Sequence, residues 1–300
     1  MSEINHVEAM KRARLSLLGL SVGDGFGEQF FTNNRVLEKR FETREIPPPR
    51  WFVTDDTMMA ISIVENLEQH GRVDQDVLAE GFAMRHAREP DRGYAGMALR
   101  ILRGIGEGVP WRQAAGEVFE GTGSMGNGAA MRVAPLGGYF AMSDVEIVVR
   151  EAALSAEVTH MHPEGKAGAI ATALAAMYAA THGAVAEGQS LLQFVHEHTP
   201  RGDTRAVLRR AMELPLERSP RVAAEMLGSG YEVISQDTVP FALWCAARHL
   251  DNYVEAMWST VSGLGDRDTT CAIAGGIVAL AVGEAGIPEE WVAYREALPA

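Results

Sequence analysis

The sequence has very few cysteines. Only Cys245 and Cys271 occur among 300 residues, and they do not form a closely spaced pair. This argues against a disulfide framework and against a cysteine-rich zinc site. Both cysteines stand among small and apolar residues, in the segments FALWCAARHL and DTTCAIAGG. We therefore expect both to be small buried side chains.

Basic residues are also in short supply. Lysine and arginine together number 27 against 40 aspartates and glutamates, which gives a formal net charge of −13. Binding to a nucleic-acid backbone requires a basic face, so we expect no unaided binding to nucleic acid. A polyanionic ligand would need a cation to be held by such a chain.

Long uninterrupted apolar runs are missing. No run reaches the length expected of a membrane span. The N-terminal segment MSEINHVEAMKRARLSLLGL has no small-residue cleavage signature, so we interpret it as a mature helix and not as a signal peptide. We expect a cytoplasmic protein without a membrane partner.

Alternating strand patterns are scarce, and helical periodicity dominates instead. Met10, Ala13, Leu17 and Leu20 fall on one face of a helix over residues 5–22. Further helices are predicted over residues 56–69, 74–87, 94–107, 110–119, 143–158, 163–182, 188–197, 203–213, 219–227, 238–249, 251–262, 269–284 and 288–296.

The composition, 47% apolar and 22% charged, is that of a globular protein. Alanine-rich stretches such as AGAIATALAAMYAA let helix backbones approach closely. We predict an all-α protein, a compact multi-helix body formed by a single domain over residues 1–300. The segment Pro47-Pro48-Pro49 cannot be helical and is expected to be an extended loop.

Two short acidic clusters, each before an apolar run of helical length, are the most informative motifs. They are Thr54-Asp55-Asp56-Thr57 and Asp266-Arg267-Asp268-Thr269, more than two hundred residues apart. Carboxylates and hydroxyls are hard oxygen ligands of Mg²⁺ and Mn²⁺, so the clusters could be two halves of one metal site. Aspartate and threonine also cap helices, and this simpler interpretation stays open.

Two glycine-rich segments could approach a ligand. Residues 23–28, GDGFGE, are expected to break the first helix and to bring two carboxylates near a metal, unless they only stop the helix. Residues 121–132, GTGSMGNGAAMR, could form a loop whose backbone N–H groups point at an anion such as a diphosphate. The second segment is neither a P-loop nor a dinucleotide fingerprint, and a plain flexible loop is the alternative.

Two further motifs could contribute polar or aromatic side chains. His160 and His162 precede Pro163, which suits the first turn of a helix, so both histidines are expected on the loop entering it. There they could contact phosphate or simply cap the helix and pack in the core. In GSGY, Tyr231 could stack on a sugar or base, although packing is the commoner role of such a ring.

These motifs together resemble the ADP-ribosylglycohydrolase family, the relatives of dinitrogenase reductase-activating glycohydrolase. The segments SVGDGFGEQF, TDDTMMA, SMGNGAAMR, THMHPEG, GSGYEV and GDRDTTCAIAGGIVA follow one another in the family's order, over about residues 18–280. The resemblance implies an all-α, orthogonal helical fold with a cleft for two divalent cations, Mg²⁺ or Mn²⁺. It also implies roles for individual residues.

The metal ligands implied by the resemblance are Thr54, Asp55 and Asp56 on one side and Asp266, Asp268 and Thr269 on the other, with Asp268 bridging. The implied substrate-binding residues are Phe119, Ser124, Met125, Gly126, Asn127, Gly128, His160 and Tyr231. For catalysis, Asp55 or Asp56 is our choice of general base, with Glu28 as the rival.

The chain departs from the family pattern in three places. Phe31 stands where many members carry a glutamate on a mobile flap, and the acid is three residues earlier, at Glu28. Arg267 replaces the middle threonine of the usual D-T-D-T segment. Met125 stands where some relatives carry an aromatic residue. These changes bear on substrate choice more than on the fold.

The resemblance implies hydrolysis of the glycosidic bond between ADP-ribose and a protein side chain or small acceptor, releasing ADP-ribose. The expected partner is thus an ADP-ribosylated protein or a small ADP-ribose conjugate. A weak or inactive ADP-ribose-binding protein of the same fold is the alternative. An all-α metal phosphohydrolase would need more histidine ligands than His160 and His162 can supply.

Overall fold

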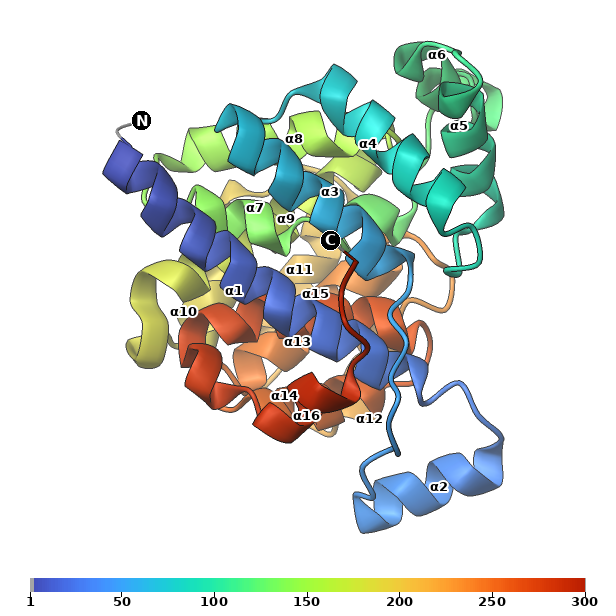
Figure 1. The fold of residues 1–300 in the computed structure, drawn as a ribbon. Helices are drawn as coiled ribbons and strands as arrows, with labels where there is room; N and C mark the ends of the chain where they lie inside the picture. The colour runs from blue at the N-terminus through green and yellow to red at the C-terminus, as the bar shows by residue number, and fades with distance from the viewer. Residues whose placement is uncertain (1–2, 300) are drawn as a thin grey trace.

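The computed structural model describes residues 3–299, which form sixteen α-helices, four short 3₁₀ helices and no strand (Figure 1). The prediction of an all-α protein is confirmed. The helices are α1 (Glu3–Glu28), α2 (Asn34–Thr43), α3 (Asp55–His70), α4 (Gln75–Arg88), α5 (Gly96–Gly106), α6 (Trp111–Gly116), α7 (Ala134–Tyr139), α8 (Val145–Glu157), α9 (Pro163–His182), α10 (Gly188–His198), α11 (Asp203–Glu213), α12 (Pro220–Leu227), α13 (Ser235–Arg248), α14 (Tyr253–Val261), α15 (Arg267–Val282) and α16 (Glu289–Tyr294).

The first helix is longer than the sequence predicts. The expected break at residues 23–27 is wrong, because α1 continues through these glycines to Glu28. A Cβ atom added at Gly23 would lie 2.3 Å from the carbonyl oxygen of Cys271, and one at Gly27 would lie 2.3 Å from that of Arg267. The glycines therefore let α1 pack against an antiparallel α15 at backbone contact. They serve helix packing and not a turn.

The helix α9 lies in the centre of the fold, in contact with α7, α8, α13 and α15. Contrary to the expectation from the sequence, the segment Pro163–Val185 is long and apolar enough to cross a membrane by length and composition alone. In the structure 67% of its most apolar window is buried inside the protein. A core helix surrounded by other helices has the same apolar composition, and α9 occupies that position.

Other elements show how local sequence determines the fold. In α3, which the sequence predicts over residues 56–69, Met59, Ile63 and Leu67 are buried, and Gly71 ends the helix with a positive φ of 66°. Cys245 and Cys271 are buried and unpaired, also as predicted. The proline-rich segment at 47–49 is not helical.

Two helices were not predicted. The helix α2 begins at an N-cap, Asn33, whose side chain accepts the N–H of Val36, and it projects from the body below α1 (Figure 1). It has only three apolar residues, Val36, Leu37 and Phe41. The helix α7 contains Pro135, Gly137 and Gly138, which are typical of turns. It is helical because Pro135 occupies its first turn and Gly137 lets it pack directly on the backbone of α9.

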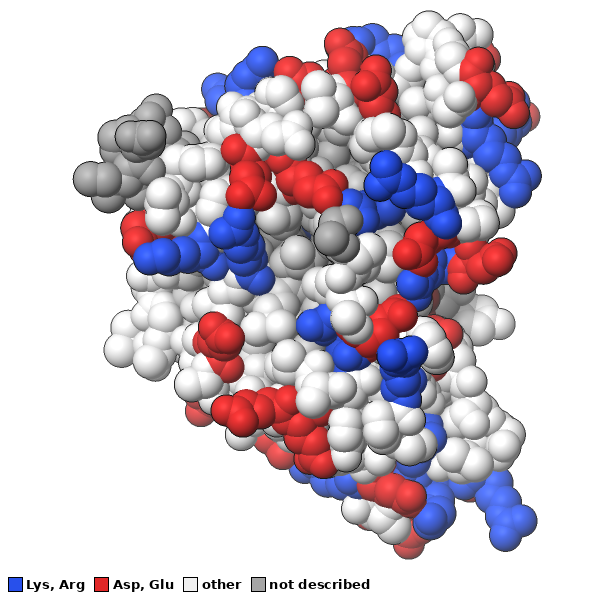
Figure 2. Space-filling model, in the orientation of Figure 1, with Lys and Arg blue, Asp and Glu red and all other residues white. Residues whose placement is uncertain are grey.

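The face seen in Figure 2 carries acidic and basic side chains that are interspersed, without a continuous basic patch.

Candidate active site

Both acidic clusters lie where a helix begins. Thr54 is the N-cap of α3, and its hydroxyl accepts the N–H of Asp56 at 3.3 Å. Asp266 occupies the same position before α15, but its side chain makes no capping hydrogen bond and instead accepts from Asn127 Nδ2 at 2.7 Å. The capping interpretation therefore accounts for Thr54 but not for Asp266.

The structure brings the two clusters into contact. Oδ2 of Asp56 lies 3.5 Å from the hydroxyl of Thr269 and 3.0 Å from the hydroxyl of Thr54. The first contact joins the start of α3 to the start of α15 across 213 residues of sequence. Both helices pack against α1, and they also contact each other directly.

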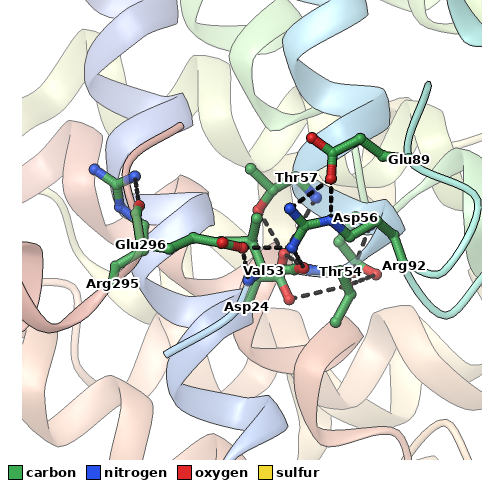
Figure 3. A network of polar contacts seen from close by, with 9 residues as sticks. All are labelled: Asp24, Val53, Thr54, Asp56, Thr57, Glu89, Arg92, Arg295 and Glu296. Atoms are coloured by element: carbon green, nitrogen blue, oxygen red, sulfur yellow. Dashed lines mark hydrogen bonds and ion pairs between the residues drawn. The ribbon is translucent and has the colours of Figure 1, made fainter. Parts of the chain in front are cut away.

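Asp24 on α1 forms hydrogen bonds with the first acidic cluster. It is fully buried in α1, and its carboxylate accepts the backbone N–H of Thr54 at 2.9 Å and that of Thr57 at 3.2 Å (Figure 3). It also accepts both threonine hydroxyls. Asp24 therefore caps α3 from a neighbouring helix, and all its acceptor capacity is directed to that helix.

The C-terminal segment holds the same region from the other side. Oε1 of Glu296 accepts the N–H of Val53 at 2.9 Å and forms an ion pair with Arg92 (Figure 3). The carbonyl of Arg92 in turn accepts the N–H of Asp55 at 2.7 Å. The backbone that presents Asp55 is thus fixed by two segments far apart in the sequence.

The carboxylates of the two clusters disfavour one another's charge. Burial, followed by the charges of Asp24 and Asp266, raises the pKa of Asp55 to about 7. Burial and the charge of Asp268 raise the pKa of Asp266 to about 8 and that of Asp56 well above its usual range. A positive charge placed among these groups would favour their ionised forms.

The residues present fit divalent cations in their chemistry. The described residues contain no group of three or more His, Cys, Asp or Glu side chains already gathered in metal-binding geometry. However, Oδ1 of Asp56 and Oδ1 of Asp268 are buried without any hydrogen-bond partner. Such oxygens are costly to bury alone, and together with the threonine hydroxyls they form a donor set suited to Mg²⁺ or Mn²⁺.

A cavity of about 640 Å³ opens beside the two clusters. Its wall brings together most of the residues proposed from the sequence. Those that line it are Asp55, Asp56, Phe119, Ser124, Met125, Gly126, Asn127, Gly128, His160, Asp266, Asp268 and Thr269. The acidic clusters form one side of the cavity and the glycine-rich loop another.

Three of the proposed residues do not line the cavity. The side chain of Thr54 is directed to Asp24 and Asp56. Glu28 is half-buried at the end of α1, where burial and the charge of Asp266 raise its pKa, so it lies near the second cluster but outside the cavity wall. Tyr231 is 85% exposed and points away into solvent.

The glycine-rich loop is tied to the second acidic cluster. Besides its bond to Asp266, the Asn127 amide donates to the hydroxyl of Thr238 at 3.1 Å, and its backbone N–H donates to the carbonyl of Val233. The hydroxyl of Ser124 accepts the N–H of Gly126 at 3.1 Å. The loop is therefore ordered by its own side chains, and the plain flexible-loop alternative does not describe it.

Phe119 presents an aromatic ring at the cavity. Phe119 and Glu120 both have positive φ values, 52° and 58°, a conformation that costs energy in residues other than glycine. The ring of Phe119 is 52% exposed although it lines the cavity. An exposed ring held in a strained backbone is suited to stacking on a ligand.

The departures Phe31 and Arg267 lie against each other. The guanidinium of Arg267 is 4.8 Å from the centroid of the Phe31 ring, a cation–π contact beside Asp266 and Asp268. Arg267 is thus held at the edge of the acidic clusters and is not free in solvent. The residue in the flap position is an aromatic partner of this arginine.

Several residues of the cavity wall were missed from the sequence. One group precedes and begins α5, and another follows Tyr231 directly. These residues are Gly93, Ala95, Met97, Ala98, Glu232, Val233 and Ile234. Gly93 and Val233 both have positive φ. Valine is β-branched and rarely adopts this conformation, so the sequence does not predict it at Val233. The motif around Tyr231 pointed to the right loop, and the cavity is lined by the next three residues.

Comparisons with known proteins agree with this geometry. The sequence pattern of the family described as ADP-ribosylglycohydrolase matches residues 5–298. The chain is 32% identical to mouse "ADP-ribosylhydrolase ARH3" over 271 residues, 80% of this chain and 72% of that protein. It is 27% identical to "ADP-ribosylarginine hydrolase Tri1" of Pseudomonas putida (strain GB-1), over 95% of this chain and 74% of that protein.

The fold also matches a solved structure. A structure titled "ADP-ribosylglycohydrolase-related protein complex" superimposes with a TM-score of 0.67 over 97% of this chain and 94% of that chain, at 24% identity. The resemblance drawn from the sequence motifs, and the fold it implied, are confirmed.

Proposed function

Since the chain belongs to the ADP-ribosylglycohydrolase family, we propose that it is a metal-dependent hydrolase that cleaves the glycosidic bond between ADP-ribose and an acceptor. The acceptor is a modified protein side chain or a small molecule, and free ADP-ribose is the product. The observation that carries the proposal is the contact of the two acidic clusters at Asp56, on the wall of the cavity.

The proposed cofactors are two divalent cations, Mg²⁺ or Mn²⁺. Bound cations would supply positive charge for holding ribose hydroxyls and would lower the pKa of water. The residues that would hold them are Thr54, Asp55, Asp56, Asp266, Asp268 and Thr269. The unpartnered oxygens of Asp56 and Asp268 support this assignment.

The chain's own carboxylates favour bond cleavage. Positive charge develops on the ribose ring as the glycosidic bond breaks, and nearby carboxylates stabilise that state more than the ground state. Asp55 is our choice of general base. It lines the cavity, whereas one oxygen of Asp56 is already in contact with two threonines and Glu28 lies outside the wall.

The other side of the cavity would hold the rest of the ligand. The loop Ser124–Gly128 and His160 would contact the diphosphate and the ribose, and the ring of Phe119 would stack on the adenine. Tyr231 could contribute only if its loop turned toward the cavity. The cavity volume of about 640 Å³ is within the range of small-molecule sites.

The alternative is an ADP-ribose-binding protein with little or no turnover. The presence of Phe31 in the flap position favours it, because this position then supplies no acid. The chain retains all six candidate metal ligands, which argues against decay of the site and favours an enzyme.

The test is the release of ADP-ribose from ADP-ribosyl-arginine and ADP-ribosyl-serine peptides. The purified protein is incubated with Mg²⁺, with Mn²⁺ and with EDTA. Release that requires a cation supports the proposal and names the linkage. Metal-dependent binding of ADP-ribose without release from either peptide would support the binder instead.

A further inference from the structure

Three side chains form a row in the wall of the cavity. Nη2 of Arg132 donates to the hydroxyl of Thr159 at 2.8 Å, and the same hydroxyl lies 2.7 Å from Nδ1 of His160. All three residues line the cavity, and each is buried. The row connects the end of the glycine-rich segment with the start of α9.

The direction of these hydrogen bonds follows from chemistry. A guanidinium can only donate, so the Thr159 oxygen accepts from Arg132. The hydroxyl has one proton of its own, and among the described residues Nδ1 of His160 is the one acceptor within its reach. If Nδ1 carried a proton instead, the hydroxyl would accept twice and its buried proton would have no partner, which is costly.

Arg132 is held firmly enough to impose this direction. Its side chain is fully buried, and its guanidinium lies 4.2 Å from the centroid of the Phe82 ring. Nη2 also donates to the carbonyl of Ser155 at 3.2 Å. No carboxylate of the described residues forms an ion pair with Arg132 that would draw it away from Thr159.

The opposite ring nitrogen of His160 faces the glycine-rich loop. A Cβ atom added at Gly126 would lie 3.2 Å from Nε2, and one added at Gly128 would lie 3.0 Å from the adjacent Cε1. No described residue forms a hydrogen bond with Nε2, which stands beside the segment assigned to ligand oxygens. Burial and the charge of Arg132 lower the pKa of His160 to about 3, so the ring is neutral.

We propose that Arg132 and Thr159 are positioning residues that fix His160 in the tautomer with its proton on Nε2. His160 then donates a hydrogen bond from Nε2 to an acceptor oxygen of the ligand. In naming ADP-ribose as that ligand, this inference rests on the proposed function. The tautomer itself follows from the three side chains and needs no ligand.

The first test is the ¹⁵N signature of the His160 ring. Protein labelled with ¹⁵N-histidine is compared with a His160→Asn variant to assign the two ring signals. We expect a neutral ring in which Nε2 is protonated and Nδ1 is not. A protonated Nδ1, or a doubly protonated ring at pH 7, would overturn the inference.

Two substitutions at Thr159 test the positioning role. Thr159→Val keeps the shape and removes the hydroxyl, so the ring should lose its single tautomer and ADP-ribose should bind about tenfold more weakly. Thr159→Ser restores the hydroxyl and should restore the tautomer and the affinity. A Thr159→Val protein that keeps both would overturn the positioning role.

The two proposals fail in different ways. If wild-type protein does not bind ADP-ribose, the proposed function fails, while the ring signature still decides the tautomer. If Thr159→Val does not fold, the wild-type spectrum still decides the tautomer, and Thr159→Ala, which also removes the hydroxyl, tests the positioning role in its place.

Discussion

The hydroxyl of Thr269 lies 3.5 Å from Oδ2 of Asp56, and this contact joins two helix starts that are 213 residues apart in the sequence. Each acidic cluster alone resembles an ordinary helix cap. Together they place four carboxylates and the hydroxyl of Thr269 in the wall of one cavity. The predictions below follow from this arrangement.

Replacing Thr269 with Val should weaken the cation site. The substitution removes the hydroxyl and keeps the shape, so we expect divalent-ion affinity to fall at least about tenfold and ADP-ribose release to slow. Titration calorimetry with Mn²⁺ measures the affinity. Thr269→Ser is the matched control and should bind Mn²⁺ as the wild type does. Equal affinity in the valine variant would exclude Thr269 from the site.

Asp24→Ala should destabilise the fold strongly. The substitution leaves two buried backbone N–H groups at the start of α3 without an acceptor, which we expect to cost about 3 kcal/mol. Asp74, which caps α4 near the surface by accepting the N–H of Val77, is the control, and its alanine variant should lose only about 1 kcal/mol. Urea unfolding gives both values. Similar losses would mean that Asp24 is an ordinary cap.

Glu296→Ala tests whether the C-terminal segment supports the active site (Figure 3). The change removes the acceptor of the Val53 N–H and the partner of Arg92, so we expect a loss of about 2 kcal/mol in stability and weaker Mn²⁺ binding. Glu290→Ala lies in the same region but affects only an exposed contact with Tyr294. A Glu296 variant with wild-type Mn²⁺ affinity would show that this support does not extend to Asp55.

Gly23→Ala tests the packing of α1 on α15. The added methyl group would lie 2.3 Å from the carbonyl oxygen of Cys271, and overpacking of this kind costs about 1–3 kcal/mol or more. The control is Gly96→Ala in α5, where an added Cβ meets nothing within 4 Å. We expect a lower Tm for the first variant and an unchanged or higher Tm for the second. A neutral Gly23 variant would contradict the close helix contact.

The sequence predicts what depends on local pattern. The helix predicted over residues 56–69 and the start of α9 at Pro163 follow from periodicity and from the preference of proline for the first helical turn, and the structure confirms them. The acidic clusters could be recognised because carboxylates at two helix starts form an unusual pattern. The other motifs could be assigned roles because they follow one another in the order of a known family.

What the sequence could not predict depends on partners in space. The glycines of α1 look like a turn until α15 is placed against them. The motif around Tyr231 identifies the correct loop, but residues 232–234 line the cavity and Tyr231 does not. Within this stretch Val233 has a positive φ of 58°, which its sequence does not indicate. The roles of Arg132 and Thr159 become visible only once their distance to His160 is known.

The most direct test of the account is the release of ADP-ribose by Asp268→Ala beside the wild type, with saturating Mg²⁺ or Mn²⁺. Asp268 lines the cavity, and its Oδ1 atom is buried without a hydrogen-bond partner within the protein. We predict that the variant loses turnover and binds the cation weakly, while circular dichroism shows unchanged helical content. Turnover close to that of the wild type would contradict the assignment of the two acidic clusters as one catalytic cation site.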